Sequence, residues 1–511
     1  MSNFEVYKSG GTSTGTAEGY KNLLRLFQNK RTIQKVLVVS APATETDRVT
    51  QLLRRKWKGE DTTSQIIRLF ESISLPLEIN FVKEDLESDI SKARTEDELL
   101  ALGEHYQAQL ITHFLNRNGI TAQWIDAGDV IRIKKKGERN IVDSVEIKCF
   151  ENPNISTFVI GGFYGKDEGS GEVLTLPSGG SDLTGDVIAA SLDAIVYENL
   201  KEVQGIFAAS PEFVNNAHCL EEITYREIRE LAYGGVQVLQ EEAMSWCRRA
   251  KVPIVVRSLL HPENPGTRVV FERDYTKMPI VGIAGKKGFT VLKVIRDKRD
   301  TFFPELFSFF SRWGISIDMV GTEESIVTVA FENEQVKRED IETLFSREFK
   351  LDNSYPNLAL VSLVGEGITD PLSVRARVLE LLDKEVIASY GPILGGMHTG
   401  TTIYHVEKFG MNSERGYLQC LSDLFLETRI PIIGISTTID SISVGTHMHR
   451  TREEIEKMSA FIMKRMMPDV ISVTRNGLLY QGSRMAISNI TFAVQECSIG
   501  KIVNRMYEEF F

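Results

Sequence analysis

The chain has 511 residues, too many for a single hydrophobic core, and its length suggests about three domains. It is 42% hydrophobic and 25% charged, as soluble globular proteins are, and its net charge of −11 excludes a basic nucleic-acid-binding domain. No apolar run approaches the roughly 18 residues of a membrane span, and the five cysteines are widely spaced without a C-x-x-C pair, so we expect a cytoplasmic protein without a metal site.

The first predicted strand, Phe4 to Tyr7, ends at Lys8 and leads into the glycine-rich stretch SGGTSTGT. A P-loop needs Lys and then Ser or Thr after its second glycine, but this chain has Thr16 and Ala17 there, so an ordinary P-loop is excluded. A glycine-rich turn between a strand and a helix can still direct backbone N–H groups at an anion. The stretch therefore predicts either an anion cradle or a flexible connection.

Strand and helix patterns then alternate along the chain. Apolar runs predict strands at residues 36–42, 156–165 and 252–258, while residues 98–119 form an amphipathic helical pattern and residues 178–194 read as a glycine turn opening a helix. This alternation predicts an α/β fold with a mainly parallel sheet and helices on both of its faces.

Ligands of such folds bind at the carboxyl ends of the strands. Lys8, Ser40, Gly161 and Gly162 all fall at predicted strand ends, and the SGGSD turn at residues 178–182 can complete the same edge. We therefore expect these residues to lie around one ligand site.

The domain organisation changes after the first half of the chain. Residues 1–280 form the expected α/β domain, from which the charged, helical segment 54–95 is expected to project. Three segments with a common β-α-β-β-α pattern follow, at residues 289–355, 356–436 and 437–511. Repetition of one element order predicts duplicated ferredoxin-like α+β modules, which often pair their sheets.

Two glycine-rich turns that open helices in one α/β domain suggest phosphoryl transfer, because this chemistry mainly needs cations and N–H groups around a polyphosphate. Lys8 would supply the cation. Asp182 could hold a substrate ammonium group, orient a cationic side chain, or act only as an acid at a helix start. Glu104 is a weaker candidate, because a glutamate on an amphipathic helix is usually solvated.

The motifs of residues 1–275, taken as a set, resemble those of aspartate kinases. They are K-x-GGTS at 8–13, VVSAP at 38–42 with Thr46-Asp47 behind it, Gly103-Glu104, Gly161-Gly162-Phe163, Gly179-Gly180-Ser181-Asp182, TYREIRELAYGG at 224–235 and VPIVVRSLLHPENPGTRV at 252–269. The repeats after residue 289 resemble the ACT-type regulatory modules of this family, although three modules exceed the usual two.

The resemblance implies an amino-acid kinase fold and phosphorylation of the side-chain carboxylate of L-aspartate by ATP and Mg²⁺, the first step toward lysine, threonine and methionine. It implies catalytic roles for Lys8 and Asp182. It assigns substrate binding to Thr46, Glu104, Ser178, Gly180 and Ser181, and nucleotide binding to Gly10, Gly11, Thr12, Ser13, Ser40, Gly179, Glu202 and Phe207. The ACT-like modules would bind an amino-acid effector, lysine or threonine, and join the chain into a homodimer or larger homo-oligomer, with neither nucleic acid nor membrane as a partner.

Four positions depart from the family pattern. Ser178 stands where the family has an arginine that can clamp a substrate carboxylate. Residues 201–205, Lys-Glu-Val-Gln-Gly, replace the family's Thr-Asp-Val-Asp-Gly at the nucleotide pocket. Ser210-Pro211-Glu212 replaces Asp-Pro-Arg, and Gln240 replaces a histidine.

These departures leave three hypotheses open. The chain can be an aspartate kinase with a rebuilt clamp, a related kinase for another carboxylate, or a non-catalytic amino-acid sensor. Retention of Lys8 and Asp182 favours a kinase, whereas the loss of charge at Ser178 favours altered chemistry. Lys201 and Arg257 are the candidate cations for replacing the missing arginine.

Overall fold

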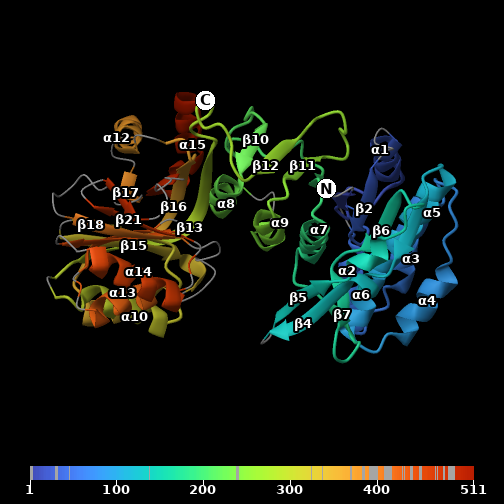
Figure 1. The fold of residues 1–511 in the computed structure, drawn as a ribbon, viewed down its shortest axis with the longest axis horizontal. Helices are drawn as coiled ribbons and strands as arrows, with labels where there is room; N and C mark the ends of the chain where they lie inside the picture. Colours follow the sequence, from blue (N-terminus) through green and yellow to red (C-terminus); the bar gives the residue numbers. More distant parts are fainter. Residues whose placement is uncertain are drawn as a thin grey trace. The chain divides into compact units, whose positions relative to one another are not determined.

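The structure is a computed structural model, drawn as a ribbon in Figure 1. It describes residues 4–28, 33–44, 47–136, 139–236, 241–297, 299–323, 325–335, 338–368, 371–382, 386–390, 401–407, 417–428, 430, 432–437, 441–447, 452–466, 468, 470–475, 478–481 and 489–511. The chain divides into two compact units. The N-terminal unit consists of residues 1–206, 219–225 and 237–273, and the C-terminal unit of residues 207–218, 226–236 and 274–511.

An eight-stranded sheet forms the centre of the N-terminal unit. Its strands, in order across the sheet, are β10 (Glu222–Thr224), β12 (Thr267–Val270), β11 (Ile254–Ser258), β9 (Val196–Lys201), β1 (Phe4–Ser9), β2 (Gln34–Val39), β6 (Thr157–Gly161) and β3 (Ala122–Ile125). All neighbouring strands run parallel except β11 and β12. The predicted mainly parallel sheet is therefore confirmed.

Helices cover both faces of this sheet, which explains why strands such as β2 are almost continuously apolar. Side chains alternate along a strand. Tyr7 of β1 shares a hydrophobic cluster with helices α1 (Ala17–Gln28) and α5 (Glu96–Arg117), whereas Lys8 reaches Asp182 of α7 (Gly180–Ser191) on the other face. The helices of this unit are α1 (Ala17–Gln28), α2 (Val49–Trp57), α3 (Thr63–Ser74), α4 (Lys83–Lys92), α5 (Glu96–Arg117), α6 (Ala127–Val130), α7 (Gly180–Ser191) and α9 (Ser245–Ala250).

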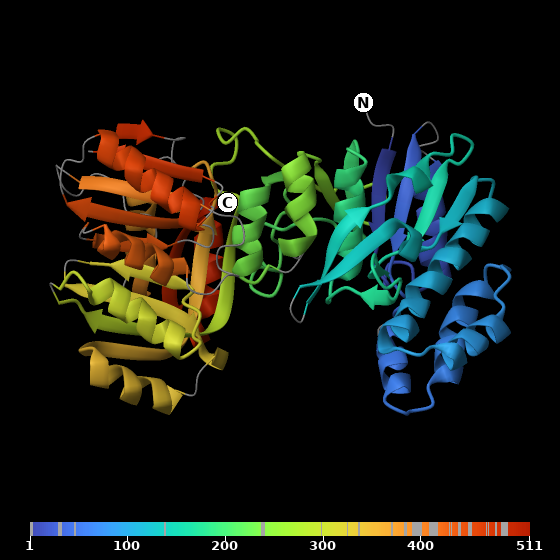
Figure 2. The same ribbon diagram turned by 60° about the horizontal axis from the view of Figure 1, so that its bottom comes forward.

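Two additions extend the N-terminal unit beyond its central sheet. Helices α2, α3 and α4 pack on one another and on α5, as expected for a segment that projects from the sheet, and Figure 2 shows this blue helical group beside α5. A second, four-stranded sheet has the order β5 (Arg139–Val145), β4 (Ile131–Lys136), β7 (Tyr164–Asp167) and β8 (Val173–Thr175).

The C-terminal unit is built on two further sheets. The six-stranded sheet has the order β14 (Met319–Thr322), β15 (Ile326–Glu332), β13 (Gly282–Ile295), β16 (Leu351–Val364), β23 (Asn489–Gln495) and β17 (Val386–Tyr390). The five-stranded sheet has the order β19 (Ile432–Thr437), β20 (Ser441–His447), β18 (Thr401–Glu407), β21 (Val470–Arg475) and β22 (Leu478–Gln481). The helices are α8 (Tyr225–Tyr233), α10 (Phe302–Arg312), α11 (Arg338–Glu348), α12 (Pro371–Leu382), α13 (Tyr417–Glu427), α14 (Arg452–Met466) and α15 (Ile499–Phe510).

Two segments of this unit repeat one element order, β-α-β-β-α-β. The first runs through β13, α10, β14, β15, α11 and β16, and the second through β18, α13, β19, β20, α14 and β21. In both, the strands lie side by side in the order second, third, first, fourth. This is the ferredoxin-like arrangement that the sequence predicted.

The remaining elements complete the six-stranded sheet. The first half of β13, residues 282–287, pairs with the second half of β16, and β23 pairs with both β16 and β17. Strands β17 and β23 are thus neighbours although β18 to β22 lie between them in the sequence. The module limits expected at residues 356 and 437 remain predictions, and β16 runs through the first of them.

The two repeats pack side by side within the one chain. The hydroxyl of Thr322 in β14 donates to the carbonyl of Ile435 in β19 at 2.7 Å, and the N–H of Ile435 donates back to that hydroxyl at 3.1 Å. Helices α10 and α13 pack against each other, and residues of both repeats belong to one hydrophobic cluster. The edge strand of each repeat therefore has a partner.

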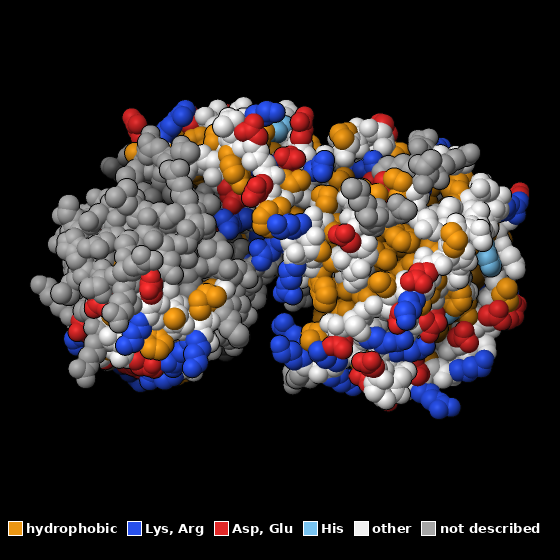
Figure 3. All heavy atoms as spheres, in the orientation of Figure 1, with side chains coloured by type: hydrophobic (Ala, Val, Ile, Leu, Met, Phe, Trp, Pro, Cys, Tyr) orange, Lys and Arg blue, Asp and Glu red, His pale blue; other side chains and the backbone are white. Residues whose placement is uncertain are grey.

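Charged side chains of both signs lie on the surface of the N-terminal unit. On the visible face of the N-terminal unit, acidic and basic side chains are interspersed (Figure 3). Among the described residues, no helix is both long and apolar enough to cross a membrane.

Candidate active site

The glycine-rich turn after β1 starts at the middle of the central sheet, because β1 lies between β2 and β9. Lys8, near the end of β1, is only 5% exposed. The N–H of Thr14 donates to the carbonyl oxygen of Gly10 at 3.2 Å. A Cβ atom at Gly11 would lie 2.2 Å from the carbonyl oxygen of Ala41, so only glycine fits there. The turn is closely packed, which favours the cradle over a flexible connection.

The second glycine-rich turn begins α7. Gly179 is the N-cap residue and has a φ of 86°, in the left-handed region that favours glycine. A Cβ atom at Gly162 would lie 2.6 Å from Cβ of Ser181, so the loop after β6 rests on the first turn of α7. Asp182 lies in this first turn, where the helix dipole stabilises a carboxylate. The second turn therefore joins the carboxyl edge of the sheet, as predicted.

Two lysines hold the carboxylate of Asp182. Nζ of Lys8 lies 2.8 Å from Oδ1, and Nζ of Lys201, at the end of β9, lies 3.1 Å from Oδ2. The amide of Asn199 also donates to Oδ1, at 3.0 Å. The side chains of Lys8 and Asp182 are 6% and 10% exposed, whereas that of Lys201 is 24% exposed. The structure thus brings the two predicted catalytic residues together and places Lys201 in contact with one of them, Asp182.

The pKa values of this cluster follow from burial and charge. Burial raises the pKa of Asp182, but the ammonium groups of Lys8 and Lys201 outweigh it and hold that pKa well below its usual range. Burial and the charge of Lys8 lower the pKa of Lys201, against the attraction of Asp182. With both lysines protonated, two ammonium groups face one carboxylate, which leaves a net positive charge for an anionic ligand.

Glu104 is buried, contrary to the usual behaviour of a glutamate on an amphipathic helix. It lies in α5, is 3% exposed, and its Oε2 has no hydrogen-bond partner among the described residues. A Cβ atom at Gly161 would lie 3.2 Å from Cβ of Glu104, so this glycine makes room for the helix. Burial raises the pKa of Glu104 to about 8, although a backbone N–H of Ala41 and the charge of Lys8 act against it. A buried carboxylate with an unpaired oxygen is suited to a ligand cation.

Other residues predicted for nucleotide binding surround the first turn. The hydroxyl of Ser13, a residue 2% exposed, donates to the carbonyl oxygen of Leu200 at 3.5 Å. The N–H of Ser40 donates to the carbonyl oxygen of Ser9 at 3.2 Å, which ties the end of β2 to that of β1. Thr12 is exposed at the tip of the turn. These placements gather the predicted phosphate-binding residues at one edge.

The structure does not gather every predicted residue there. Ser178 is exposed, and so is Glu202, one residue beyond the end of β9. Gly180 is buried in the first turn of α7. Thr46 lies outside the described residues, and Phe207 belongs to the C-terminal unit.

Arg257, the second candidate for replacing the missing arginine, has another partner. Its Nε lies 2.7 Å from Oε2 of Glu198, and the two side chains are 11% and 5% exposed. This ion pair joins β11 to β9 within the sheet. By contrast, Asn199 belongs to none of the sequence motifs, although its Oδ1 is buried without a partner among the described residues. Asn199 lies two residues before Lys201 on the same strand, and residues two apart on a strand face the same side of the sheet. This spacing could have indicated that Asn199 faces the site.

The charged side chains of the site suit a polyphosphate better than a metal ion held by the protein alone. Lys8, Lys201 and the packed first turn lie together at the edge of the sheet, and their positive charge suits a phosphate ligand. Among the described residues, no group of three or more His, Cys, Asp or Glu side chains is placed to hold a metal ion. Magnesium commonly binds through substrate phosphates with one or two carboxylates, so the site suits an ion that arrives on the nucleotide.

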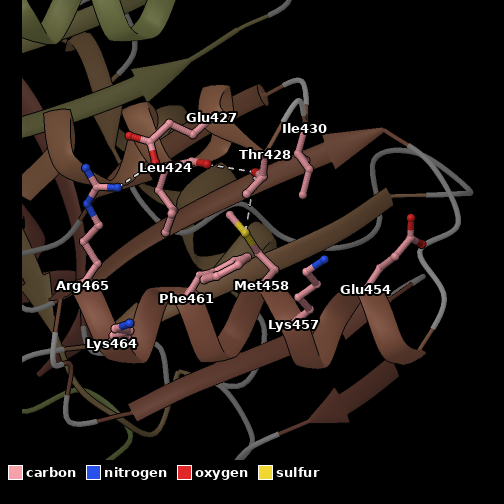
Figure 4. Close-up of a pocket in the computed structure, with 10 residues that line it drawn as sticks. All are labelled: Leu424, Glu427, Thr428, Ile430, Glu454, Lys457, Met458, Phe461, Lys464 and Arg465. Atoms are coloured by element: carbon pink, nitrogen blue, oxygen red, sulfur yellow. Dashed lines mark hydrogen bonds and ion pairs between the residues drawn. The ribbon is translucent and has the colours of Figure 1, made fainter.

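A separate pocket of about 750 Å³ lies between α13 and α14 in the C-terminal unit (Figure 4). It is lined by Leu424, Glu427, Thr428, Ile430, Glu454, Lys457, Met458, Phe461, Lys464 and Arg465. Leu424 and Met458 are buried. Nη1 of Arg465 lies 2.7 Å from Oε2 of Glu427, and Figure 4 shows the two side chains pointing toward each other. None of the predicted site residues lines this pocket.

The fold and the site together define a class. The profile of the amino acid kinase family matches residues 3–258, and this chain belongs to that family. Two relatives that match most of the chain are aspartokinases. Aspartokinase 3 of Bacillus subtilis (strain 168) is 27% identical over 415 residues, which cover 74% of this chain and 90% of that protein. Chloroplastic aspartokinase 1 of Arabidopsis thaliana is 28% identical over 397 residues, which cover 70% of this chain and 68% of that protein.

Solved structures share the fold. The aspartate kinase of Clostridium acetobutylicum superposes with a TM-score of 0.70 at 23% identity, covering 99% of this chain and all of that one. Aspartokinase III of E. coli, solved in complex with aspartate and ADP, superposes with a TM-score of 0.60 at 19% identity, covering 99% of this chain and 100% of that chain. The resemblance to aspartate kinases that the motifs indicated is confirmed.

Proposed function

We propose that this chain transfers the γ-phosphoryl group of ATP to the side-chain carboxylate of L-aspartate, giving 4-phospho-L-aspartate and ADP. The observation that carries the proposal is the contact of Lys8 and Lys201 with opposite oxygens of Asp182, at 2.8 and 3.1 Å. Membership of the amino acid kinase family and the aspartokinase relatives support it. In this role the chain catalyses the first step toward lysine, threonine and methionine.

The transfer needs positioning and charge stabilisation more than acid–base chemistry. A carboxylate oxygen of aspartate attacks the γ-phosphorus, the bond from that phosphorus to the β–γ bridging oxygen breaks, and ADP leaves with the bonding electron pair. No proton moves, because the attacking carboxylate is already ionised at neutral pH. Lys8 and the N–H groups of residues 11–13 stabilise the charge of the phosphoryl group, while Asp182 holds Lys8 in place.

The amino-acid pocket is proposed to lie beside Glu104. Its buried, unpaired oxygen would bind the ammonium group of the substrate. The predicted contributions of Thr46, Ser178, Gly180 and Ser181 remain part of the proposal. Because Ser178 carries no charge, another group must bind the α-carboxylate if the substrate is aspartate.

ATP is proposed to bind as its magnesium complex. Magnesium neutralises phosphate charge when bound, and Asp182, which contacts both lysines of the proposed phosphate site, is a carboxylate that could help to hold it. The nucleotide contacts proposed for Gly10, Gly11, Thr12, Ser13, Ser40, Gly179, Glu202 and Phe207 complete this part of the proposal.

Regulation is assigned to the C-terminal unit. Its ferredoxin-like repeats are proposed to act as ACT-type modules that bind an amino-acid effector, lysine or threonine, and to contribute to a homodimer or larger homo-oligomer. A ligand that binds only the folded state raises the melting temperature. Millimolar lysine or threonine is therefore expected to raise the melting temperature of the purified chain, and the absence of a shift with either would remove support for this effector.

The proposal is tested by trapping the acyl phosphate. Purified protein is incubated with ATP, magnesium, hydroxylamine and L-aspartate, in parallel with a panel of other amino acids and carboxylates, and the hydroxamate is measured. Product from aspartate supports the proposal. Hydroxamate only from another acid would assign the chain to a related kinase, which the neutral Ser178 would explain. If no acid of the panel gave hydroxamate but the protein still bound amino acids, the chain would be a sensor.

A further inference from the structure

We propose that Lys201 is a further catalytic residue, whose ammonium group binds the phosphoryl group in transfer together with that of Lys8. This inference rests on the proposed phosphoryl transfer and assigns a role to a lysine at a position where the family pattern has threonine. It does not depend on which carboxylate accepts the phosphoryl group.

The sheet register places Lys201 beside the proposed phosphate cradle. Lys8 pairs with Asn199 and Ser9 with Leu200 in the parallel strands β1 and β9, so Lys201 is the next residue and stands level with Gly10. The N–H of Gly10 donates to the carbonyl oxygen of Leu200 at 3.4 Å, which binds the glycine-rich turn to the end of β9. Lys201 therefore leaves its strand at the point where the turn begins.

The shared partner brings the two ammonium groups together. Lys8 binds Oδ1 of Asp182 and Lys201 binds Oδ2, so both cations point at one carboxylate from neighbouring strands. Two ammonium groups share this one carboxylate. Of the other acids that act on these lysines, Glu202 is exposed and Glu104 is buried with a raised pKa, so the positive charge beside Asp182 can attract a further anion. Lys201 is the more exposed of the two, at 24% against 6%, and is thus the cation that an entering phosphate can reach.

Two other roles for Lys201 are weaker. A purely structural role would consist of giving Oδ2 of Asp182 its partner, since Lys8 and Asn199 both bind Oδ1, but it does not account for a lysine side chain that is 24% exposed at the end of its strand. As a clamp for the substrate α-carboxylate, Lys201 would take over the role of the arginine that is missing at position 178. Position 178, however, precedes α7 and is exposed. Lys201 instead borders the turn at Gly10, which favours the phosphate.

The test compares Lys201→Met and Lys201→Arg with the control Lys166→Met. Lys166 is a suitable control because it also pairs with an aspartate, Asp129 at 3.3 Å, but belongs to the four-stranded sheet. Lys201→Met is expected to lower kcat about 10²- to 10³-fold, the usual effect of removing one group that stabilises transition-state charge. KM for the carboxylate substrate is expected to change less than about threefold. Lys201→Arg should recover part of the rate, and Lys166→Met should match the parent protein.

Binding supplies a readout that does not need turnover. Calorimetry compares Mg-ADP with the magnesium complex of an ATP analogue whose β–γ bridge is an imide. A cation on the γ-phosphate should make the parent protein prefer the triphosphate, and Lys201→Met is expected to reduce that preference about tenfold, or 1.4 kcal/mol. If the parent protein is inactive with every carboxylate, the proposed function fails, while this comparison still decides the phosphate contact.

Three results would overturn the inference. An unchanged kcat in Lys201→Met, with the parent melting temperature, would show that Lys201 does not stabilise the transition state. A raised KM for the carboxylate at constant kcat would make it a substrate clamp instead. An undiminished preference for the triphosphate analogue would place its charge away from the γ-phosphate.

Discussion

The Glu104→Gln variant tests the amino-acid pocket through its pH dependence. Burial raises the pKa of Glu104 to about 8, so only about one carboxyl group in ten is ionised at pH 7. The ionised form is the one that can pair with the substrate ammonium group. Raising the pH therefore favours binding, and KM for aspartate should fall about ninefold from pH 6 to 7 and about fivefold from pH 7 to 8, then level off.

The same argument predicts proton release. Binding of aspartate at pH 7 converts a mostly neutral Glu104 into its ionised form, which should release about 0.9 proton per substrate bound. Calorimetry in two buffers of different ionisation enthalpy measures this number. In Glu104→Gln the proton release should disappear and KM should become higher and nearly independent of pH in this range.

A control on the same helix separates this effect from general changes. Glu96 is exposed in the first turn of α5, and Glu96→Gln should retain the pH dependence and proton release of the parent protein. Titration of the substrate itself is common to all three proteins and cancels in the comparison. If the fall of KM with pH persisted in Glu104→Gln, the assignment of this carboxylate to the ammonium group would be wrong.

Three further substitutions test the site and its support. Lys8→Met should lower kcat about 10²- to 10³-fold in the hydroxamate assay while the melting temperature changes little, because Lys201 still pairs with Asp182; a nearly full rate would contradict the role of Lys8. Gly11→Ala places Cβ 2.2 Å from the carbonyl oxygen of Ala41, so it should lower the free energy of unfolding by about 1–3 kcal/mol and remove most of the activity. Denaturation at the same midpoint as the parent protein would show that the turn has room for a Cβ atom. Asp186→Ala removes the acceptor of two N–H groups at the start of α9, each at 2.9 Å, and should cost about 2–4 kcal/mol in urea unfolding, while a loss below about 0.5 kcal/mol would show that water replaces it.

Much of the fold could be predicted because local patterns report it directly. Alternating apolar strands and amphipathic helices indicated a parallel sheet covered on both faces, and the repeated element order after residue 289 indicated ferredoxin-like modules. Both glycine-rich turns could be expected at the carboxyl edge of that sheet, and the structure places Lys8 and Asp182, one from each turn region, 2.8 Å apart.

The course of the C-terminal unit could not be predicted in the same way. A strand pattern specifies which faces are apolar, but not which distant strand becomes the neighbour. The pairing of β17 with β23, across the whole second repeat, is therefore absent from the sequence pattern. The side-by-side contact of β14 with β19, through Thr322 and Ile435, is equally a product of tertiary packing.

By itself, the sequence determined the class of fold, the two glycine-rich turns between strands and helices, and the motifs that resemble those of aspartate kinases, because these depend on residues close together in the chain. Only the tertiary structure decided which charged side chains of the site contact one another and which are buried. It paired Arg257 with Glu198, directed Lys201 to Asp182, and buried Glu104 with an unpaired oxygen. Each outcome depends on which side chains from separate elements meet out of water, and burial together with neighbouring charge sets what a titratable group can do.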